Sequence, residues 1–293
     1  MTLSMTTSLI GKTCLVTGAT RGLGLHTAIQ LAALGASVVI AGRSQERLRA
    51  AVDTIRTAAP GSQVQTLHGD LSAQADVRQI AAQFSASYPA LDVLVNNVGL
   101  NSMKFHRSPD GIEYTWALNY LNHFLLTNLL LPNLRRAAHQ TGEARVVEVT
   151  SSMYRFASSR FESAQPERGY NGFFAYAQSK RAMLVFINEL TRRLDGSGIT
   201  ANAVTPGAVK TNIATENPPI YQSIMSVINR YSLPVDEGAK PIVRLCADPL
   251  LCTISGAYYV KYRQRSLSKD ITSPATGRRL WQISAQATGL PTE

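Results

Sequence analysis

Short apolar runs rich in β-branched residues alternate with longer stretches of helical periodicity along most of the chain. Several of the short runs are almost continuously apolar, which is typical of strands covered on both faces. The predicted strands lie at 13–17, 37–41, 64–67, 91–96, 145–150, 199–204 and 257–260. The predicted helices lie at 22–34, 44–58, 73–87, 110–138, 174–194 and 235–247. This alternation predicts an α/β fold of the doubly wound Rossmann type, with a parallel seven-stranded sheet flanked by helices.

The segments between these elements set the expected domain organisation. A length of 293 residues, without a linker, repeat or low-complexity tract, predicts a single domain over 1–293. Irregular stretches predict substrate-side insertions near 153–172 and 212–232, and a C-terminal extension over 261–293 that is irregular as far as 277. Ligands of such sheets bind beyond the carboxyl ends of the strands, so functional residues should gather there.

The composition suits a soluble enzyme, with 45% hydrophobic and 16% charged residues and no apolar run of membrane-spanning length. The first twelve residues are too short and too polar for a signal peptide. Cys14, Cys246 and Cys252 show neither metal nor disulfide spacing, which predicts reduced thiols. We therefore expect a cytoplasmic protein without a metal site.

The net charge of +10 is partly concentrated in basic residues between 261 and 279. Such a segment could meet nucleic acid, an anionic membrane surface or an acidic substrate. No zinc finger or other nucleic-acid module accompanies the charge, so a solvated basic surface is favoured and no nucleic-acid partner is expected. Attachment to a membrane surface through this tail is an alternative that salt-dependent liposome binding would test.

A glycine-rich turn joins the first predicted strand to the first predicted helix, in the sequence Thr17-Gly18-Ala19-Thr20-Arg21-Gly22-Leu23-Gly24. Glycines let the backbone approach a pyrophosphate, and a helix N-terminus offers free N–H groups and a positive dipole. The spacing GxxxGxG differs from the GxGxxG dinucleotide fingerprint. A tight structural turn without a ligand is the alternative interpretation.

Tyr176 and Lys180 lie one helical turn apart in the predicted helix 174–194, so their side chains share a face. A lysine ammonium near a phenol favours the phenolate. An ordinary tyrosine titrates near ~10, and work near neutral pH needs a fall of roughly 3 pKa units. This pairing would make the tyrosine a general acid/base. Taken alone, the spacing also suits a surface tyrosine beside a solvated lysine.

The end of the second predicted strand bears on the choice of cofactor. It reads Ala41-Gly42-Arg43, without the acidic residue that holds the ribose hydroxyls of NAD. Arg43 and Arg21 instead supply two cations, and guanidinium groups bind phosphate well. The sequence thus favours NADP(H), with two ordinary surface arginines as the alternative.

Further polar segments follow the other predicted strands, at 70–71, 96–99, 150–152 and 206–211. The ordered set TGxxxGxG, NNxG, a serine after the fifth strand, YxxxK and a Pro-Gly turn resembles the short-chain dehydrogenase/reductase family over nearly the whole chain. The match is closest to the retinol-dehydrogenase-like branch. The segments that carry this closer resemblance are 119–127, 255–258, 278–281 and 289–291.

The resemblance implies transfer of a hydride between a nicotinamide and a carbonyl or alcohol carbon. Tyr176 would be the general acid/base, and Lys180 would hold the nicotinamide ribose and lower the tyrosine pKa. Asn119 would help to hold a water in a proton relay. Ser152 would hydrogen-bond the substrate oxygen, because the family usually uses the second serine of such a pair, although Ser151 remains the competing residue.

The resemblance also implies the cofactor contacts. The glycines would line the phosphate turn, Asp70 would face the adenine, Asn96 would brace the cofactor, and Thr211 would lie near the pyrophosphate or the carboxamide. The full implied set is Gly18, Thr20, Arg21, Gly22, Leu23, Gly24, Arg43, Asp70, Leu71, Asn96, Asn97, Gly99, Tyr176, Lys180, Pro206, Gly207, Val209 and Thr211.

Three departures from the family pattern matter. Val98 replaces a usual alanine and could shift the cofactor slightly. Glu148 interrupts an apolar strand, so we expect a partner or an exposed edge for its carboxylate. The sequence shows no N-terminal anchor like that of microsomal retinol dehydrogenases, which puts retinoid substrates in doubt.

The interval between Ser152 and Tyr176 is rich in aromatic residues. These side chains either wall a pocket for a bulky apolar substrate or only pack the insertion onto the body. We expect parts of 153–172 and 212–232 to form a mobile rim over the substrate. The large side chains in question are Met153, Tyr154, Phe156, Phe161, Tyr170, Phe173 and Phe174, together with Ile220, Tyr221 and Met225.

Other questions stay open at this point. His106 and His123 are more simply packed or surface residues than catalytic ones. The predicted helix 174–194 is apolar on more than one face, which indicates either deep burial or a subunit contact in a homodimer or homotetramer. A non-catalytic NADP-binding sensor or scaffold is the alternative function, although such proteins usually lose the tyrosine or the lysine.

Overall fold

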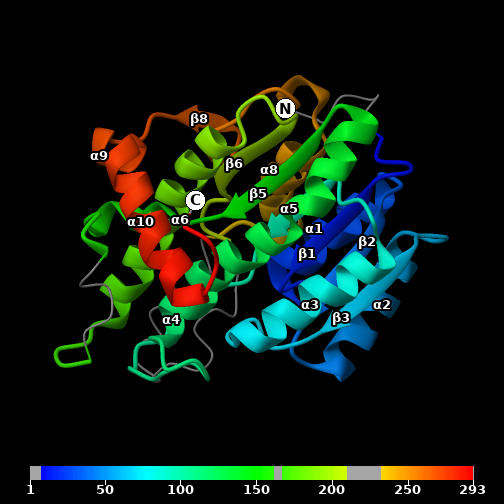
Figure 1. Cartoon of the computed structure of the whole chain (residues 1–293). Coiled ribbons are helices and arrows are strands. Elements are labelled where there is room, and N and C mark those ends of the chain that lie inside the picture. The colour runs from blue at the N-terminus through cyan, green and yellow to red at the C-terminus, as the bar shows by residue number, and fades with distance from the viewer. Residues whose placement is uncertain (1–7, 162–166, 210–231, 293) are drawn as a thin grey trace.

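A computed structural model describes residues 8–161, 167–209 and 232–292, and over these residues it forms one eight-stranded sheet between two layers of helices (Figure 1). The strand order is β3-β2-β1-β4-β5-β6-β7-β8, and all neighbouring pairs are parallel except β7 with β8. This confirms the doubly wound fold. The strands are β1 (Thr13–Thr17), β2 (Ser37–Gly42), β3 (Val64–His68), β4 (Val93–Asn96), β5 (Ala144–Val149), β6 (Ile199–Thr205), β7 (Tyr258–Val260) and β8 (Arg263–Arg265).

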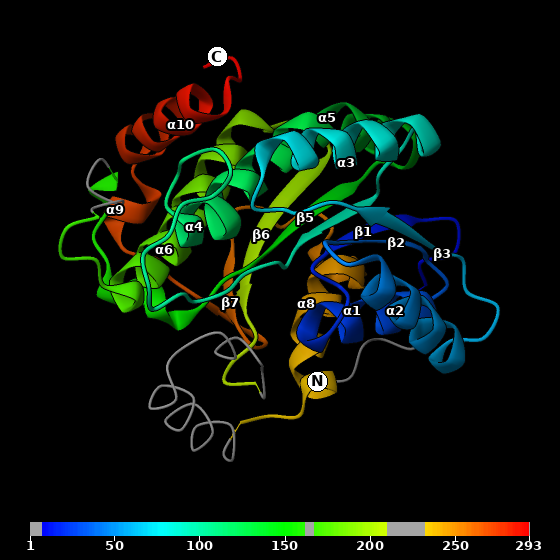
Figure 2. The ribbon, with the colours of Figure 1, turned by 90° about the horizontal axis from the view of Figure 1, so that it is seen from below.

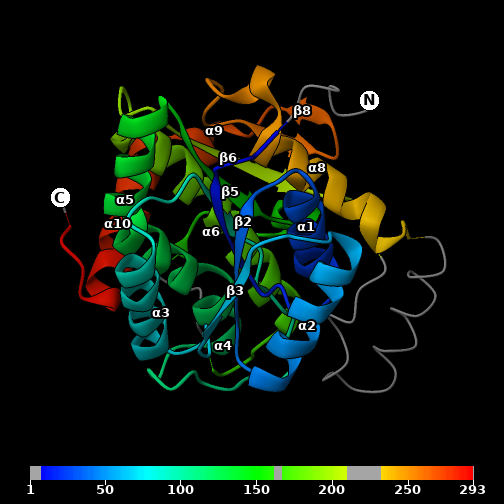
Figure 3. The same cartoon turned by 90° about the vertical axis from the view of Figure 1, so that its right-hand side faces the viewer.

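Helices cover both faces of the sheet, as Figure 2 and Figure 3 show, and an apolar core fills the space on each side. One face packs against α1 (Gly22–Ala33), α2 (Gln45–Ala58) and α8 (Val235–Ala247). The other packs against α3 (Gln74–Ser87), α5 (Asn122–Thr141) and α6 (Gly172–Arg193), and α10 (Pro274–Thr288) lies on the outer side of α5 and α6. Burial on both sides explains why the central strands read as continuous apolar runs.

The eighth strand is an addition to the seven that were predicted. Lys261 adopts a left-handed φ of 54° directly after β7, and the chain turns back to pair Tyr258 with Arg265. All three residues of β8 (Arg263–Arg265) are exposed. Periodicity could not reveal a strand with no apolar position, and its two arginines suit a sheet edge that must not pair with another chain.

The predicted helix 110–138 is interrupted in the structure. It begins at α4 (Tyr114–Trp116), where the Glu113 carboxylate accepts from two backbone N–H groups, and it continues through a π-helical turn, η1 (Ala117–Leu121), into α5. The prediction was wrong about its first residues and its continuity. Such a π-turn widens the helix by one residue and often marks a functional position; here it carries Asn119.

The C-terminal region also contains more structure than the sequence predicted. After the short helix α9 (Lys269–Thr272), Ser273 caps α10, Pro274 occupies its first turn, and Gly289 ends it with a φ of 64°. The Trp281 ring lies 4.9 Å from Phe124 on α5 and 6.0 Å from Phe186 on α6. Helix α10 of the same chain therefore buries one apolar face of α6, and this burial explains why that face is apolar.

Candidate active site

The glycine-rich turn between β1 and α1 takes a conformation that other residues would not accept. Gly18 and Gly22 have φ values of 64° and 58°. A Cβ on Gly24 would lie 2.5 Å from both the Gly18 carbonyl oxygen and Asn97 Nδ2. Arg21 occupies the N-cap position of α1 and makes no side-chain cap. The first N–H groups of α1 thus face a tight glycine cradle, an arrangement that suits an anion such as a pyrophosphate.

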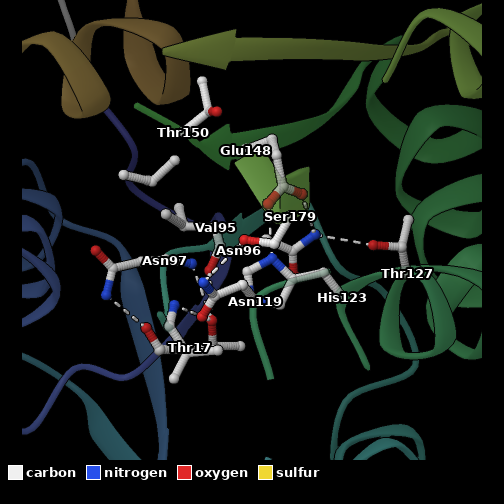
Figure 4. Close-up of polar contacts among 12 residues, drawn as sticks. Thr17, Val95, Asn96, Asn97, Asn119, His123, Thr127, Glu148, Thr150 and Ser179 are labelled. Atoms are coloured by element: carbon white, nitrogen blue, oxygen red, sulfur yellow. Dashed lines mark hydrogen bonds and ion pairs between the residues drawn. The ribbon is translucent and has the colours of Figure 1, made fainter. Parts of the chain in front are cut away.

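The loop after β4 is tied to this turn (Figure 4). The Thr17 hydroxyl accepts from the backbone N–H groups of Asn97 and Val98, at 2.9 and 3.1 Å. Asn97 Nδ2 donates to the Thr17 carbonyl at 2.9 Å, and a Cβ on Gly18 would lie 3.1 Å from Val98 Cα. Two strand ends far apart in sequence are thereby fixed as one unit, and Val98 fits within it.

Asn96 and Asn97 point in different directions, as successive residues of a strand do. The Asn96 side chain is fully buried and donates to Thr127 Oγ1 at 2.9 Å and to Glu148 Oε2 at 3.2 Å. Any support that it gives to a cofactor is therefore indirect, whereas Asn97 touches the glycine turn itself.

Other predicted cofactor residues surround the same turn. Thr20 lies against Gly42 at the end of β2, next to the exposed Arg43, whose Nη1 is 3.4 Å from the Tyr114 hydroxyl. Asp70 Oδ1 accepts from Ser72 N at 2.9 Å. The remaining contacts fix the loop: Leu71 is buried and its carbonyl accepts from Asn122 Nδ2 at 2.8 Å.

The segment that follows β6 lies next to the start of α1. Gly207, which follows Pro206, has a φ of 97°, so the chain turns sharply there. Val209 and Leu23 both lie against Gly238 on α8, which brings the end of this segment next to the start of α1. Thr211 lies outside the described residues.

Tyr176 and Lys180 are brought together with Asn119 and Gly99. Lys180 Nζ lies 5.6 Å from the centre of the Tyr176 ring and donates to the Val149 carbonyl at 3.1 Å. A Cβ on Gly99 would lie 3.3 Å from Lys180 Nζ and 3.4 Å from Asn119 Oδ1. Burial lowers the pKa of Lys180 to about 8, and the charge of Glu148 opposes that fall. The ammonium is thus a strong local charge, because little water screens it.

The Asn119 side chain holds the site together rather than facing solvent. Its Oδ1 accepts from Leu100 N and its Nδ2 donates to the Leu100 carbonyl, both at 2.9 Å. Nδ2 also donates to Ser179 Oγ at 3.0 Å, and Ser179 donates to the Tyr176 carbonyl at 2.8 Å. The π-turn therefore connects the loop after β4 to the first turns of α6.

The two serines after β5 differ in their bonding. Thr150 donates to the Lys180 carbonyl at 3.1 Å, so it fixes the strand end to α6. Ser151 caps the short helix η2 (Ser152–Phe156) and accepts from Met153 N at 3.3 Å. Burial raises the pKa of Tyr258, and hydrogen bonds from Thr205 and Ser152 oppose that rise. Ser151 is half-buried and Ser152 is exposed.

Glu148 has the partner that its place in the strand required. It is fully buried, and its Oε1 lies 2.6 Å from Nδ1 of the equally buried His123. His123 is a packed residue, as expected, yet no motif in the sequence indicated that it pairs with Glu148. The one signal that could have suggested it was that each is a polar residue within an apolar segment.

The aromatic residues of the insertion divide into two groups. Tyr154 and Phe161 are buried, so packing explains them. Phe156 and Phe174 are more than half exposed, and Phe173 lies 5.4 Å from Phe156 and 5.6 Å from Phe174. These three rings form an aromatic cluster at the first turn of α6, in which Phe173 is half-buried. Residues 162–166 and 210–231, including the rest of the expected rim, lie outside the described residues.

Within the described residues no group of His, Cys, Asp or Glu side chains could hold a metal ion. In the same part of the chain, no helix combines the length and the apolar character needed to cross a bilayer. All three cysteines are free thiols.

Comparison with known proteins agrees with this geometry. The short chain dehydrogenase family model matches residues 12–221. The chain is 33% identical to human retinol dehydrogenase 14, over 96% of this chain and 87% of that protein, and 33% identical to human polyprenol dehydrogenase, over 95% and 86%. A solved structure of an uncharacterized Mycobacterium paratuberculosis protein superposes with a TM-score of 0.78 at 30% identity, covering 98% of this chain and 96% of that one. The Pseudomonas aeruginosa RhlG/NADP complex gives 0.70 at 26% identity, over 86% and 95%.

Proposed function

The chain belongs to the short-chain dehydrogenase/reductase family, in its retinol-dehydrogenase-like branch, and from this premise we propose that it is an NADP(H)-dependent oxidoreductase of bulky apolar carbonyls and alcohols. Membership of the family makes it an oxidoreductase that uses a nicotinamide cofactor. The choice of NADP(H), the role of Tyr176 and the size of the substrate are the parts proposed. The observation that carries the proposal is the buried Lys180 ammonium beneath the Tyr176 ring, next to Gly99.

The residues of the turn fit a dinucleotide. Gly18 and Gly24 leave a cradle that a Cβ would fill, and the start of α1 offers N–H groups to a pyrophosphate. When bound, the nicotinamide would supply or accept the hydride. Lys180 would donate to the ribose hydroxyls.

Proton transfer would be the task of the protein. Tyr176 would give a proton to the substrate oxygen in reduction and take it back in oxidation. The Lys180 charge would stabilise the phenolate, because an opposite charge nearby favours the ionised form. Asn119 would keep the Tyr176 backbone in place through Ser179. Each of these contributions depends on position rather than on new covalent chemistry.

The serine that binds the substrate oxygen would be Ser152, the choice that the family resemblance implies. Its side chain is exposed at the start of η2. Ser151 is the competing residue, because it accepts a 3.3 Å bond from Met153 N and keeps its hydroxyl proton for another acceptor.

We expect Ser152→Ala to lower kcat by about a hundredfold or more, because loss of one preorganised donor to a developing oxyanion has roughly that effect. Ser151→Ala is the matched control, one residue away, and should keep kcat within a few-fold of wild type. Steady-state kinetics on both variants would decide between the two residues. The opposite ranking would give the role to Ser151.

Arg43→Asp should reduce the preference for NADPH over NADH by roughly ten- to a hundredfold. The change removes a cation from the 2′-phosphate and adds an acceptor for ribose hydroxyls, and hydrogen bonds to charged groups contribute about 1.5–3 kcal/mol. Binding titrations with both cofactors would measure it. Arg49→Asp, at an exposed position on α2, controls for the general loss of positive charge. An unaltered NADPH/NADH ratio would mean that Arg43 does not meet the phosphate.

A bulky apolar substrate is supported by two observations. The aromatic cluster of Phe156, Phe173 and Phe174 lies at the start of the helix that carries Tyr176. The relatives named above act, by their names, on retinol and polyprenol. Exposure of Phe156 and Phe174 within this cluster suits a surface that meets an apolar ligand.

A panel of aldehydes, ketones and alcohols of increasing apolar size, assayed with both cofactors, tests the proposed function. We expect kcat/KM to rise with apolar size and to be higher with NADP(H). If no compound turns over while NADPH still binds, the chain is the non-catalytic sensor or scaffold of the alternative interpretation.

A further inference from the structure

A buried carboxylate lies directly behind Lys180. Glu148 is the residue before Val149, whose carbonyl accepts the 3.1 Å hydrogen bond from Lys180 Nζ. Glu148 is fully buried, and Lys180 is 4% exposed. Two groups that normally carry opposite charges therefore share one dry region between β5 and α6. Figure 4 shows the Glu148 side chain among Asn96, His123 and Ser179.

The contacts of Glu148 indicate that it is ionised. One oxygen lies 2.6 Å from His123 Nδ1, and the other accepts from Asn96 Nδ2 at 3.2 Å. Both bonds place a donor on a carboxylate oxygen, and donation to the charged form favours ionisation.

The state of His123 follows from its second nitrogen. His123 Nε2 is buried and has no hydrogen-bond partner. A protonated imidazole would bury an unpaired N–H at this position, which costs free energy, whereas a neutral ring with its proton on Nδ1 would not. His123 thus donates to Glu148 without neutralising it, and the charge of Glu148 remains to act on Lys180.

The other buried carboxylates of the described residues bind partners other than Lys180. Asp92 pairs with Lys12 next to the start of β1. Glu113 caps the first turn of α4, and Glu189 pairs with two arginines of its own helix. Glu148 is the acid whose charge acts on Lys180.

We propose that Glu148 is a positioning residue that supplies the buried counter-charge of Lys180, and that His123 and Asn96 hold its carboxylate in place. The inference deepens the proposed function, because the Lys180 ammonium is the group that would stabilise the Tyr176 phenolate. Burial alone drives a lysine toward its neutral form, and a fixed anion nearby opposes this. Among the described residues, the titratable groups near the ammonium are Tyr176 on α6 and Glu148 on β5, and neutral Asn119 lies on a third side.

The direct test is an NMR pH titration of the Lys180 ammonium in the apo-protein. The chain has seven lysines, so a spectrum of isotope-labelled lysine side chains is simple, and Lys180→Met identifies the signal by its absence. We expect the wild-type ammonium to titrate near the pKa of about 8. In Glu148→Gln the pKa should fall by at least about 1 unit, or tenfold in proton affinity, because the opposing charge is gone.

Glutamine is a suitable replacement for Glu148. Glutamine has nearly the same shape as glutamate, and its amide oxygen can still accept from Asn96 Nδ2, the bond that Glu148 Oε2 accepts now. His123→Leu provides a second variant that never touches Lys180. It removes a hydrogen-bond partner that holds the Glu148 carboxylate in place, and it should lower the pKa of Lys180 as Glu148→Gln does.

Glu189→Gln is the matched control, since it removes a buried carboxylate from the same helix as Lys180 and should leave the Lys180 titration unchanged. The readout needs no substrate, so it is independent of whether the proposed reaction is correct. A folded Glu148→Gln protein, judged by thermal unfolding and NADP binding, whose Lys180 pKa stays within about 0.3 unit of wild type would overturn the proposal.

Discussion

Tyr176→Phe should abolish turnover and leave cofactor affinity nearly unchanged. The substitution removes only the phenolic oxygen, and the phenylalanine ring can still lie beside Lys180, whose Nζ is 5.6 Å from the tyrosine ring centre. A positioned general acid/base contributes about a hundredfold or more to the rate. Steady-state kcat with the best substrate of the carbonyl panel, together with a binding titration of NADPH, would measure both quantities.

The matched control for this prediction is Tyr170→Phe. Tyr170 is also half-buried near the site, but its hydroxyl bonds to Glu113 Oε1 at 3.0 Å and to the Ser102 carbonyl at 3.1 Å. We expect some loss of stability and a kcat close to wild type. If Tyr176→Phe keeps more than about a tenth of the wild-type kcat, Tyr176 is not the acid/base.

Trp281→Ala should lower the free energy of unfolding by about 3–5 kcal/mol, the usual cost of removing a large buried aromatic side chain. The indole is 6% exposed and packs edge-on to Phe124 at 4.9 Å. The Arg193 guanidinium also lies 4.0 Å from its ring centre. Urea unfolding would measure the loss. Since α10 covers an apolar face of α6, we also expect the variant to self-associate, which light scattering would detect.

Trp281→Phe separates packing from the presence of any aromatic ring. The indole Nε1 is buried without a hydrogen-bond partner, so phenylalanine removes an unsatisfied group as well as some contact area. We expect Trp281→Phe to lower the free energy of unfolding by less than half as much as Trp281→Ala does. If the urea midpoint of Trp281→Ala equals that of wild type, packing of Trp281 against α5 and α6 does not stabilise the fold.

Local sequence patterns were sufficient for much of this protein. Alternating apolar runs and amphipathic stretches predicted the parallel strands and most helices, since a strand or helix is detected within a window of a few turns. The glycines of the 17–24 turn were readable because their spacing encodes a backbone that only glycine adopts readily. The common face of Tyr176 and Lys180 followed from helical geometry alone.

The tertiary structure decided what depends on contacts between distant segments. Helix α10 buries a face made largely of small or polar residues, Gly277, Ser284, Ala285 and Thr288 beside Leu280 and Trp281, so its hydrophobic pattern is weak until α5 and α6 cover it.

The same reason applies to the site. The pairing of Glu148 with His123 joins a strand to a helix 25 residues away, and the bond from Asn119 to Ser179 joins the π-turn to α6. Neither leaves a periodic trace in the sequence. The sequence by itself therefore determined the fold class and the common face of Tyr176 and Lys180, whereas long-range packing alone decided that Lys180 is buried and that Glu148 lies against His123.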